Sequence, residues 1–101
     1  MTMLHIVNKS PSQTRTLNSC LRLARDGSAV LLIEDGVYAA TKGNADAGAL
    51  HAACGRLQVY ALQPDCDARG VTALLAEGVT LVDYGGFVDL VAQRATAHSW
   101  L

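Results

Sequence analysis

Residues 28–33, SAVLLI, decide the fold class of this chain. Every position after Ser28 is apolar and most side chains are branched, a pattern typical of a central parallel strand that is covered on both faces. Glu34, Asp35 and Gly36 follow at once and mark the end of the strand. The run therefore predicts a parallel sheet with a layer on each face.

Three further runs extend the predicted sheet. Residues 3–7 (MLHIV) and 79–82 (VTLV) are short and mostly apolar, and residues 56–62 (RLQVYAL) alternate between polar and apolar positions. The final residues, 96–101, are interpreted as a tail that contains Trp100. Four strands are thus predicted, spread over the length of the chain.

Helices are predicted in the intervals between these strands. Residues 14–25 form an amphipathic helix, ended by the Asp-Gly pair at 26–27, because an apolar residue recurs at i, i+3, i+4 and i+7 in Leu17, Cys20, Leu21 and Ala24. Shorter helices are predicted at residues 45–53, 64–70, 71–77 and 84–95, the last with one side formed by Phe87, Leu90, Val91 and Arg94. Strands that alternate with helices predict βαβ units with right-handed crossovers. We therefore expect one α/β domain over residues 1–101, a three-layer sandwich with a short, mainly parallel, flavodoxin-like sheet of about four or five strands.

Composition excludes several classes of function. Eight Lys and Arg against nine Asp and Glu give a formal net charge of −1, with no run of like sign, so direct nucleic-acid binding is not expected. The apolar runs are too short for a membrane span or a signal peptide, so we expect a cytoplasmic protein without membrane contact. Half of the residues are hydrophobic in a chain of only 101, so some apolar surface is expected to face a partner.

The three cysteines are odd in number, widely spaced and without a C-x-x-C pair, so we expect free thiols and no metal site. No phosphate-binding loop motif occurs, so no cofactor is expected. Cys54 and Cys66 are interpreted as incidental, and Asp65 and Asp67 are expected to raise the pKa of Cys66.

Cys20 is the candidate for chemistry. A persulfide carrier needs a thiolate that accepts a sulfane sulfur and passes it on. Lys9, Arg22 and Arg25 are close in sequence and would favour that thiolate. The alternative is that Cys20 packs in the core, because it lies on the apolar stripe of its helix.

An interface is expected directly after the central strand, at Gly36, Val37 and Tyr38. The segment is apolar and includes an aromatic residue of the kind enriched at interface cores. Trp100 is a second expected contact with a partner. The alternative for Trp100 is packing against the sheet of its own chain.

Several stretches together resemble the TusB/DsrH family of small subunits of sulfur-relay complexes. The stretches are MLHIVNKSP at 3–11, CLRLA at 20–24, DGSAVLLIEDGVYAA at 26–40, VYAL at 59–62, DARG at 67–70, VDYGGFVDL at 82–90 and SWL at 99–101. The resemblance spans nearly the whole chain, and the combination of these stretches is far more specific than any one of them.

The resemblance implies a DsrE/F/H-like fold and a hexamer with two copies each of this chain, a TusC/DsrF-type and a TusD/DsrE-type subunit. Such a complex passes persulfide sulfur from a donor to an acceptor protein. The resemblance makes this chain an accessory subunit of a sulfurtransferase complex, with the main sulfur-carrying cysteine on a sister subunit.

Two pathways are consistent with the resemblance. In the TusBCD version the complex serves 2-thiolation of wobble uridine in tRNA, which we expect here. In the DsrEFH version it serves dissimilatory sulfur oxidation, and the cysteine at position 20 is similar to that of DsrH-type members. A stand-alone module that binds a small ligand and a homo-oligomeric scaffold are alternatives of other classes.

Overall fold

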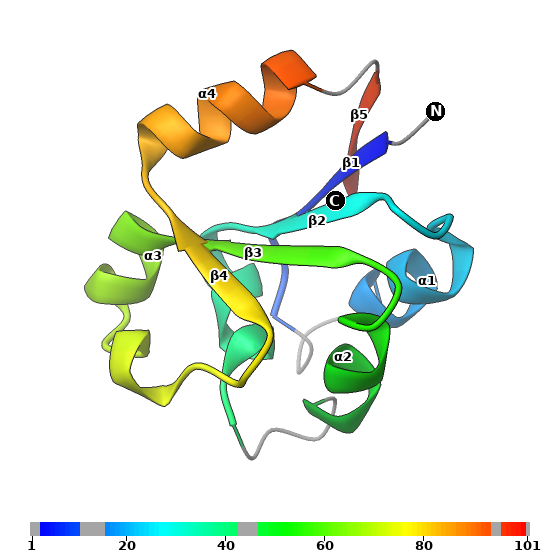
Figure 1. Ribbon diagram of the computed structural model, residues 1–101. Coiled ribbons are helices and arrows are strands. Elements are labelled where there is room, and N and C mark those ends of the chain that lie inside the picture. The colour runs from blue at the N-terminus through cyan, green and yellow to red at the C-terminus, as the bar shows by residue number, and fades with distance from the viewer. Residues whose placement is uncertain (1–2, 11–15, 43–46, 94–95, 101) are drawn as a thin grey trace.

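Figure 1 shows the computed structural model of the chain, which describes residues 3–10, 16–42, 47–93 and 96–100. The strands form one five-stranded sheet in the order β4-β3-β2-β1-β5, and every neighbouring pair is parallel. The predicted α/β class with a parallel sheet is confirmed, and the five strands lie within the expected four or five. The elements in chain order are β1 (Met3–Val7), α1 (Thr16–Leu23), β2 (Ala29–Leu32), η1 (Glu34–Ala40), α2 (Ala47–Ala53), β3 (Gln58–Leu62), α3 (Gln63–Ala68), η2 (Thr72–Leu74), β4 (Val79–Val82), α4 (Tyr84–Gln93) and β5 (Thr96–Trp100).

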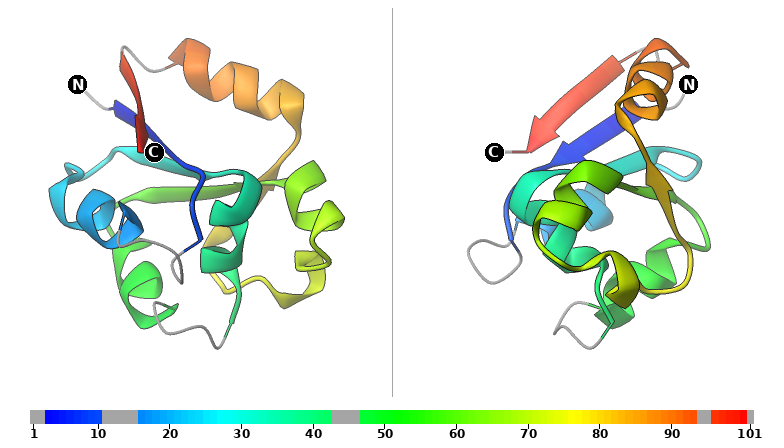
Figure 2. Two further views of the ribbon diagram at one scale, coloured as in Figure 1. Left: turned by 180° about the vertical axis from the view of Figure 1, so that it is seen from behind. Right: turned by 90° about the vertical axis from the view of Figure 1, so that its left-hand side faces the viewer.

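The order of the strands places the helices on the two faces of the sheet. From β1 to β4 each new strand is added on the same side, so right-handed crossovers put α1, α2 and α3 on one face. The chain then returns from β4 to β5, and α4 covers the opposite face (Figures 1 and 2). The three layers are therefore the layer of α1, α2, η1 and α3, the sheet, and α4.

The central strand β2 lies where the apolar run predicted it. All four of its residues are fully buried. Val30 and Leu32 belong to the larger core, which includes residues of α1, α2 and η1, whereas Ala29 and Leu31 belong to a smaller core with Leu90 of α4. Burying a Val or Leu side chain contributes about 1.5–3 kcal/mol, so the strand gains from apolar side chains on both faces.

Strand β5 differs from the prediction, which gave residues 96–101 no strand. It pairs in parallel with β1 along its whole length and places Trp100 beside Val7. Residues 97–99 are exposed, so the segment lacks the apolar pattern by which a strand is recognised. Its pairing depends on the free edge of β1, which only the folded sheet provides.

The end of helix α1 is capped by Arg56, the residue at which the third strand was predicted to begin. Gly27 has a φ of 85°, the left-handed conformation that the predicted Asp-Gly stop requires. The Arg56 guanidinium donates to the carbonyl of Ala24 at 2.7 Å and to the carbonyl of Leu21. These bonds satisfy carbonyls at the end of the helix that have no helical partner. Strand β3 begins two residues later than predicted, at Gln58.

The remaining helices differ from the prediction mainly in length. Residues 36–40 lie within the 3₁₀ helix η1, and residues 71–77 form only the single turn η2. Arg94 lies outside the described residues. None of the helices in the described ranges is both long and apolar enough to cross a membrane.

Candidate functional site

Cys20 lies on the inner face of α1 and has no exposed surface. It belongs to the larger core together with Leu17, Leu21 and Ala24, the stripe that the periodicity predicted. Burial raises the pKa of the Cys20 thiol to about 12. The thiol is therefore protonated at neutral pH, and only a thiolate is a good nucleophile. Of the two interpretations from the sequence, this geometry favours core packing.

The cations that were expected to favour a Cys20 thiolate face solvent. Lys9, Arg22 and Arg25 are all exposed. The raised pKa of Cys20 has burial as its cause, with no compensating charge. Nearness in sequence did not bring these cations to the sulfur, because Arg22 lies off the inner stripe of α1 and Lys9 and Arg25 lie outside the helix.

The other two cysteines differ in accessibility. Cys66 is fully buried, and its pKa is raised first by burial and then by Asp67 and Asp65, as the sequence predicted for these carboxylates. Cys54 is half-buried, and its pKa is raised by burial. Its sulfur lies so close to Gly78 that a Cβ there would be 2.9 Å from it. Cys54 is therefore the most accessible of the three thiols.

An ion-pair cluster occupies the carboxyl edge of the sheet, where open parallel sheets commonly bind ligands. Arg69 donates from Nε to Oδ1 of Asp35 at 3.0 Å, and its Nη1 lies 4.0 Å from Oδ1 of Asp65. The bond to Asp35 is the main cause of a raised pKa for Arg69. The backbone N–H of Glu34, which has a left-handed φ of 49°, donates to Oδ2 of Asp65 at 2.7 Å.

Arg69 was missed as a member of this cluster because its partner Asp35 lies 34 positions earlier in the chain. Both Asp35 and Asp65 are therefore already engaged by groups of the same chain. This cluster holds η1 against α3.

The predicted interface segment is divided between core and surface. Gly36 packs so closely on β1 that a Cβ there would lie 2.3 Å from the carbonyl oxygen of Val7. Val37 is fully buried, whereas Tyr38 is 39% exposed. The side chain of this segment that can reach a partner is therefore Tyr38, and the interface itself stays a prediction.

Trp100 packs on the sheet of its own chain. Its indole Nε1–H donates to Nδ1 of His5 at 3.0 Å, and its ring meets that of His98 edge-on with centroids 5.1 Å apart. The internal packing that was the alternative for Trp100 is therefore observed. The ring is only half-buried, so its contact with a partner also stays a prediction.

Two exposed apolar features were missed by the sequence interpretation. On α4, Tyr84, Val88 and Val91 recur at i, i+4 and i+7 and are 59%, 65% and 43% exposed. The sequence analysis predicted that Val91 shares one side of the helix with Phe87 and Leu90. Phe87 and Leu90 pack in the smaller core, and Val91 does not. The spacing of these three residues, which matches the 3.6-residue period of a helix, could have revealed this outer stripe from the sequence. It was overlooked because α4 is apolar on more than one side.

The second feature is Leu74, which is 54% exposed. Its backbone carbonyl accepts from the N–H of Lys42 at 2.8 Å, so η2 is bonded to the segment that follows η1 and Tyr38. Nothing in the pattern of residues 71–77 distinguishes Leu74 from a core residue.

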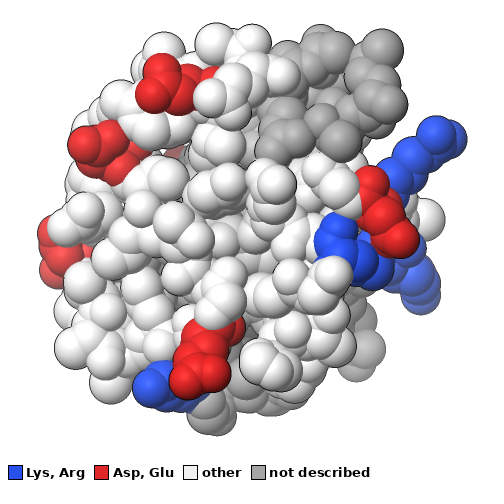
Figure 3. Space-filling model, viewed as in Figure 1, with Lys and Arg blue, Asp and Glu red and all other residues white. Residues whose placement is uncertain are grey.

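Charge is unevenly spread over the face of the molecule seen in Figure 3. Basic side chains gather on the side of α1 with acidic atoms among them, acidic side chains lie on the side of α3 and α4, and an adjoining acidic and basic group lies at the lower edge. Within the described ranges, no three His, Cys, Asp or Glu side chains are grouped so that they could hold a metal ion.

Comparison with known proteins places the chain in a family. The family described as DsrH like protein matches residues 9–97. TusB of Escherichia coli strain K12 is 38% identical to the chain over 98 residues, which cover 97% of the chain and 100% of TusB. The chain belongs to the TusB/DsrH family. TusB of Serratia proteamaculans, with 37% identity over the same coverage, agrees with this membership.

Solved structures support the fold of this TusB/DsrH family member. The crystal structure of the ychN protein from Escherichia coli has a TM-score of 0.77 at 19% identity and covers 98% of the chain and 99% of that protein. The protein of unknown function MTH1491 from Methanobacterium thermoautotrophicum has a TM-score of 0.72 at 22% identity, with coverage of 94% and 95%. The resemblance noted in the sequence is thus confirmed for family and fold.

Proposed function

We propose that this chain is the small subunit of a cytoplasmic sulfur-relay complex that serves 2-thiolation of the wobble uridine in tRNA. Family membership over 97% of the chain, with relatives named TusB, is the observation that carries the proposal. Sister subunits of the TusC/DsrF and TusD/DsrE types complete a hexamer with two copies of each. Separate proteins donate the sulfur and accept it.

Within this complex the chain contributes architecture, and a sister subunit contributes the sulfur-carrying cysteine. In each transfer a thiolate attacks a persulfide, so that a new S–S bond forms as the old one breaks. With its pKa raised to about 12 by burial, the Cys20 thiol is protonated at pH 7 and is a poor nucleophile. Persulfide transfer through Cys20 is the alternative role, and it requires α1 to open.

Two exposed apolar surfaces support contact with more than one neighbour. Tyr38 and Leu74 lie on segments that are bonded to each other on the η1 side of the sheet. The stripe of α4 lies on the opposite face. A subunit held between two others needs two such surfaces, whereas a free monomer gains nothing from exposing them.

Complementation of a deletion strain tests the function. We expect deletion of the gene in its source organism to remove 2-thiouridine from tRNA, as measured by mass spectrometry of nucleosides. Wild type and Cys20→Ala are both expected to restore it. Restoration by wild type alone, with a Cys20→Ala protein whose circular dichroism shows a native fold, would assign sulfur transfer to Cys20. Unchanged 2-thiouridine in the deletion strain would contradict the tRNA role.

A second candidate function is supported by the match to the DsrH like family and by the presence of Cys20. In this case the complex works in dissimilatory sulfur oxidation. The same deletion then leaves 2-thiouridine unchanged and slows the oxidation of reduced sulfur compounds. The two measurements on one strain therefore separate the two pathways.

The interface proposal is tested by a charge placed on the Tyr38 surface. Tyr38→Asp is expected to weaken assembly with the sister subunits about tenfold or more, because an aromatic anchor is replaced by a desolvated carboxylate. Ala52→Asp, at an exposed position on α2, is the matched control. Equal affinity of both variants in a pull-down titration would remove Tyr38 from the interface.

A further inference from the structure

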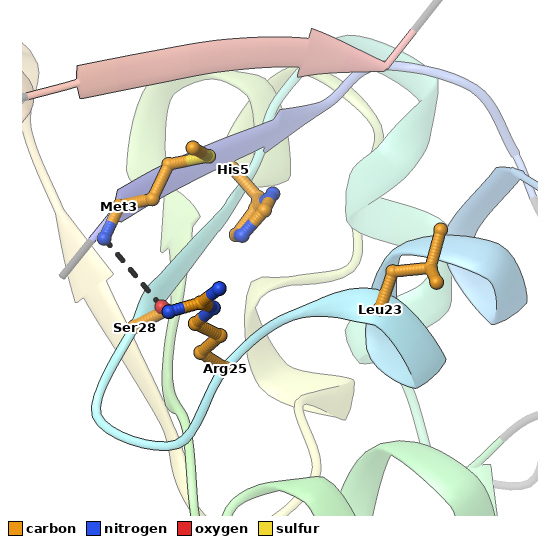
Figure 4. A pocket seen from close by; sticks show the side chains of 5 residues that line it. All are labelled: Met3, His5, Leu23, Arg25 and Ser28. Atoms are coloured by element: carbon orange, nitrogen blue, oxygen red, sulfur yellow. Dashed lines mark hydrogen bonds between the residues drawn. The ribbon is translucent and has the colours of Figure 1, made fainter.

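A hollow opens between β1 and the end of α1. Its volume is about 270 Å³, and the residues that line it are Met3, His5, Leu23, Arg25 and Ser28 (Figure 4). His5 and Ser28 are 6% and 1% exposed and form its floor, whereas Leu23 and Arg25 are exposed and form its rim. Buried polar groups thus lie below a mixed apolar and cationic opening.

The Trp100 indole determines which nitrogen of His5 carries the proton. An indole N–H can only donate, so Nδ1 of His5 accepts its bond and is unprotonated. The pKa of His5 is lowered, first by burial and then by His98, so the ring is neutral near pH 7. The proton of a neutral ring with a bare Nδ1 is on Nε2.

The Nε2–H group of His5 is available to a ligand. In Figure 4 one ring nitrogen of His5 is directed toward Ser28 and Arg25. Within the described ranges, the hydrogen bond from Trp100 is the one that the side chain of His5 makes. Because His5 lines the hollow, a ligand placed there can accept a hydrogen bond from this N–H in place of water.

Two further donors border the same space. The Ser28 hydroxyl accepts from the Met3 N–H at 3.5 Å, which leaves its hydrogen free to donate. Arg25 forms no ion pair with a described residue. Its sequence neighbour Asp26 is engaged by Arg56 at 3.3 Å. The guanidinium at the rim therefore forms no ion pair with the acid next to it in sequence.

We propose that this hollow binds a small organic carboxylate. The carboxylate accepts hydrogen bonds from the guanidinium of Arg25, Nε2–H of His5 and the hydroxyl of Ser28. Its short aliphatic part packs against Met3 and Leu23. A guanidinium matches a planar carboxylate with two parallel hydrogen bonds. A hollow of about 270 Å³ has room for a ligand of a few carbon atoms. The site does not depend on the sulfur-relay function.

Trp100 supplies the readout, because it is the one tryptophan of the chain and donates to His5. Titration of the full chain with butyrate near neutral pH is expected to change its fluorescence with a Kd on the order of 1 mM, as suits so small a ligand. Butylammonium and butyramide have the same length without the negative charge, and neither is expected to change the emission.

Two arginine variants test the residues. Arg25→Gln is expected to weaken butyrate binding about tenfold or more, since a charged bidentate contact is lost. Arg22→Gln, an exposed position of α1 that does not line the hollow, is expected to bind as wild type does. Thermal unfolding of both variants separates a binding effect from a folding effect.

Three outcomes would overturn the proposal. The first is no saturable response to butyrate up to about 100 mM, a hundredfold above the expected Kd. The second is an equal loss of binding in both arginine variants. The third is a response to inorganic sulfate at the same ionic strength as strong as that to butyrate, which would show general anion binding instead of a carboxylate site.

Discussion

At the level of single residues, the position of a side chain on its helix decides what chemistry it can do. Cys20 falls on the stripe of α1 that meets the sheet, so the periodicity that predicts the helix also buries the sulfur. Reactive cysteines lie in partly exposed, electropositive places that lower the pKa of the thiol. Cys20 has the opposite environment, with a pKa of about 12.

The accessible thiol is expected to be Cys54. In the folded chain, a disulfide reagent such as DTNB should react with Cys54 at least ~100-fold faster than with Cys20 or Cys66, because thiolate fraction and access govern the rate. Peptide mass spectrometry after partial reaction identifies the labelled residue. Cys54→Ser is the control and should show no fast thiol. Labelling of Cys20 as fast as Cys54 would show that α1 opens readily.

His5 makes stability depend on pH. Its pKa in the folded chain lies below the ordinary value of 6.5, through burial and then through His98. Above about 6.5 both states are neutral and the folded state keeps its full stability. As the pH falls further, the unfolded chain takes up a proton that the folded chain resists, so the free energy of unfolding decreases until the folded pKa is passed.

Urea unfolding at about pH 7.5 and about pH 5 measures this loss. His5→Gln is expected to show a smaller loss than wild type, because glutamine can still accept from Trp100 but does not titrate. His51→Gln, at an exposed position, should retain the loss of wild type. An equal loss in all three proteins would assign the acid sensitivity to other groups.

At the level of elements, local pattern predicts what is apolar and buried. The run of β2, the stripe of α1 and the Asp-Gly stop at Gly27 were all visible in the sequence and are confirmed. Strand β5 was not visible in the sequence, because its exposed residues 97–99 lack the apolar pattern of a strand and its pairing partner is the edge of β1. Contacts between segments far apart in the chain, such as Arg69 with Asp35, also leave no local signal.

Gly36 fixes the distance between η1 and β1. Gly36→Ala is expected to destabilise the chain by about 1–3 kcal/mol, since the added Cβ overlaps the Val7 carbonyl, 2.3 Å away. Gly48→Ala is the matched control, because nothing lies within 4 Å of a Cβ in that exposed part of α2. It should stabilise the helix by up to about 1 kcal/mol. Equal unfolding midpoints for both variants would contradict the close packing of Gly36.

At the level of the whole molecule, a small, half-hydrophobic chain covers both faces of its sheet and still exposes apolar side chains. Composition predicted such a surface but not its place, because exposure depends on how the elements pack. The large side chains concerned are Leu23, Tyr38, Leu74, Tyr84, Val88 and Val91. They lie on both faces of the sheet, which suits a subunit with more than one neighbour.

Native mass spectrometry of the three co-expressed subunits tests the central proposal most directly. This chain, tagged for purification, is produced together with the TusC/DsrF-type and TusD/DsrE-type proteins of the same genome. We predict one complex with two copies of each of the three chains. Recovery of the chain alone, as a monomer or as a homo-oligomer, while the two sister proteins remain folded in solution, would contradict its role in a sulfur-relay complex.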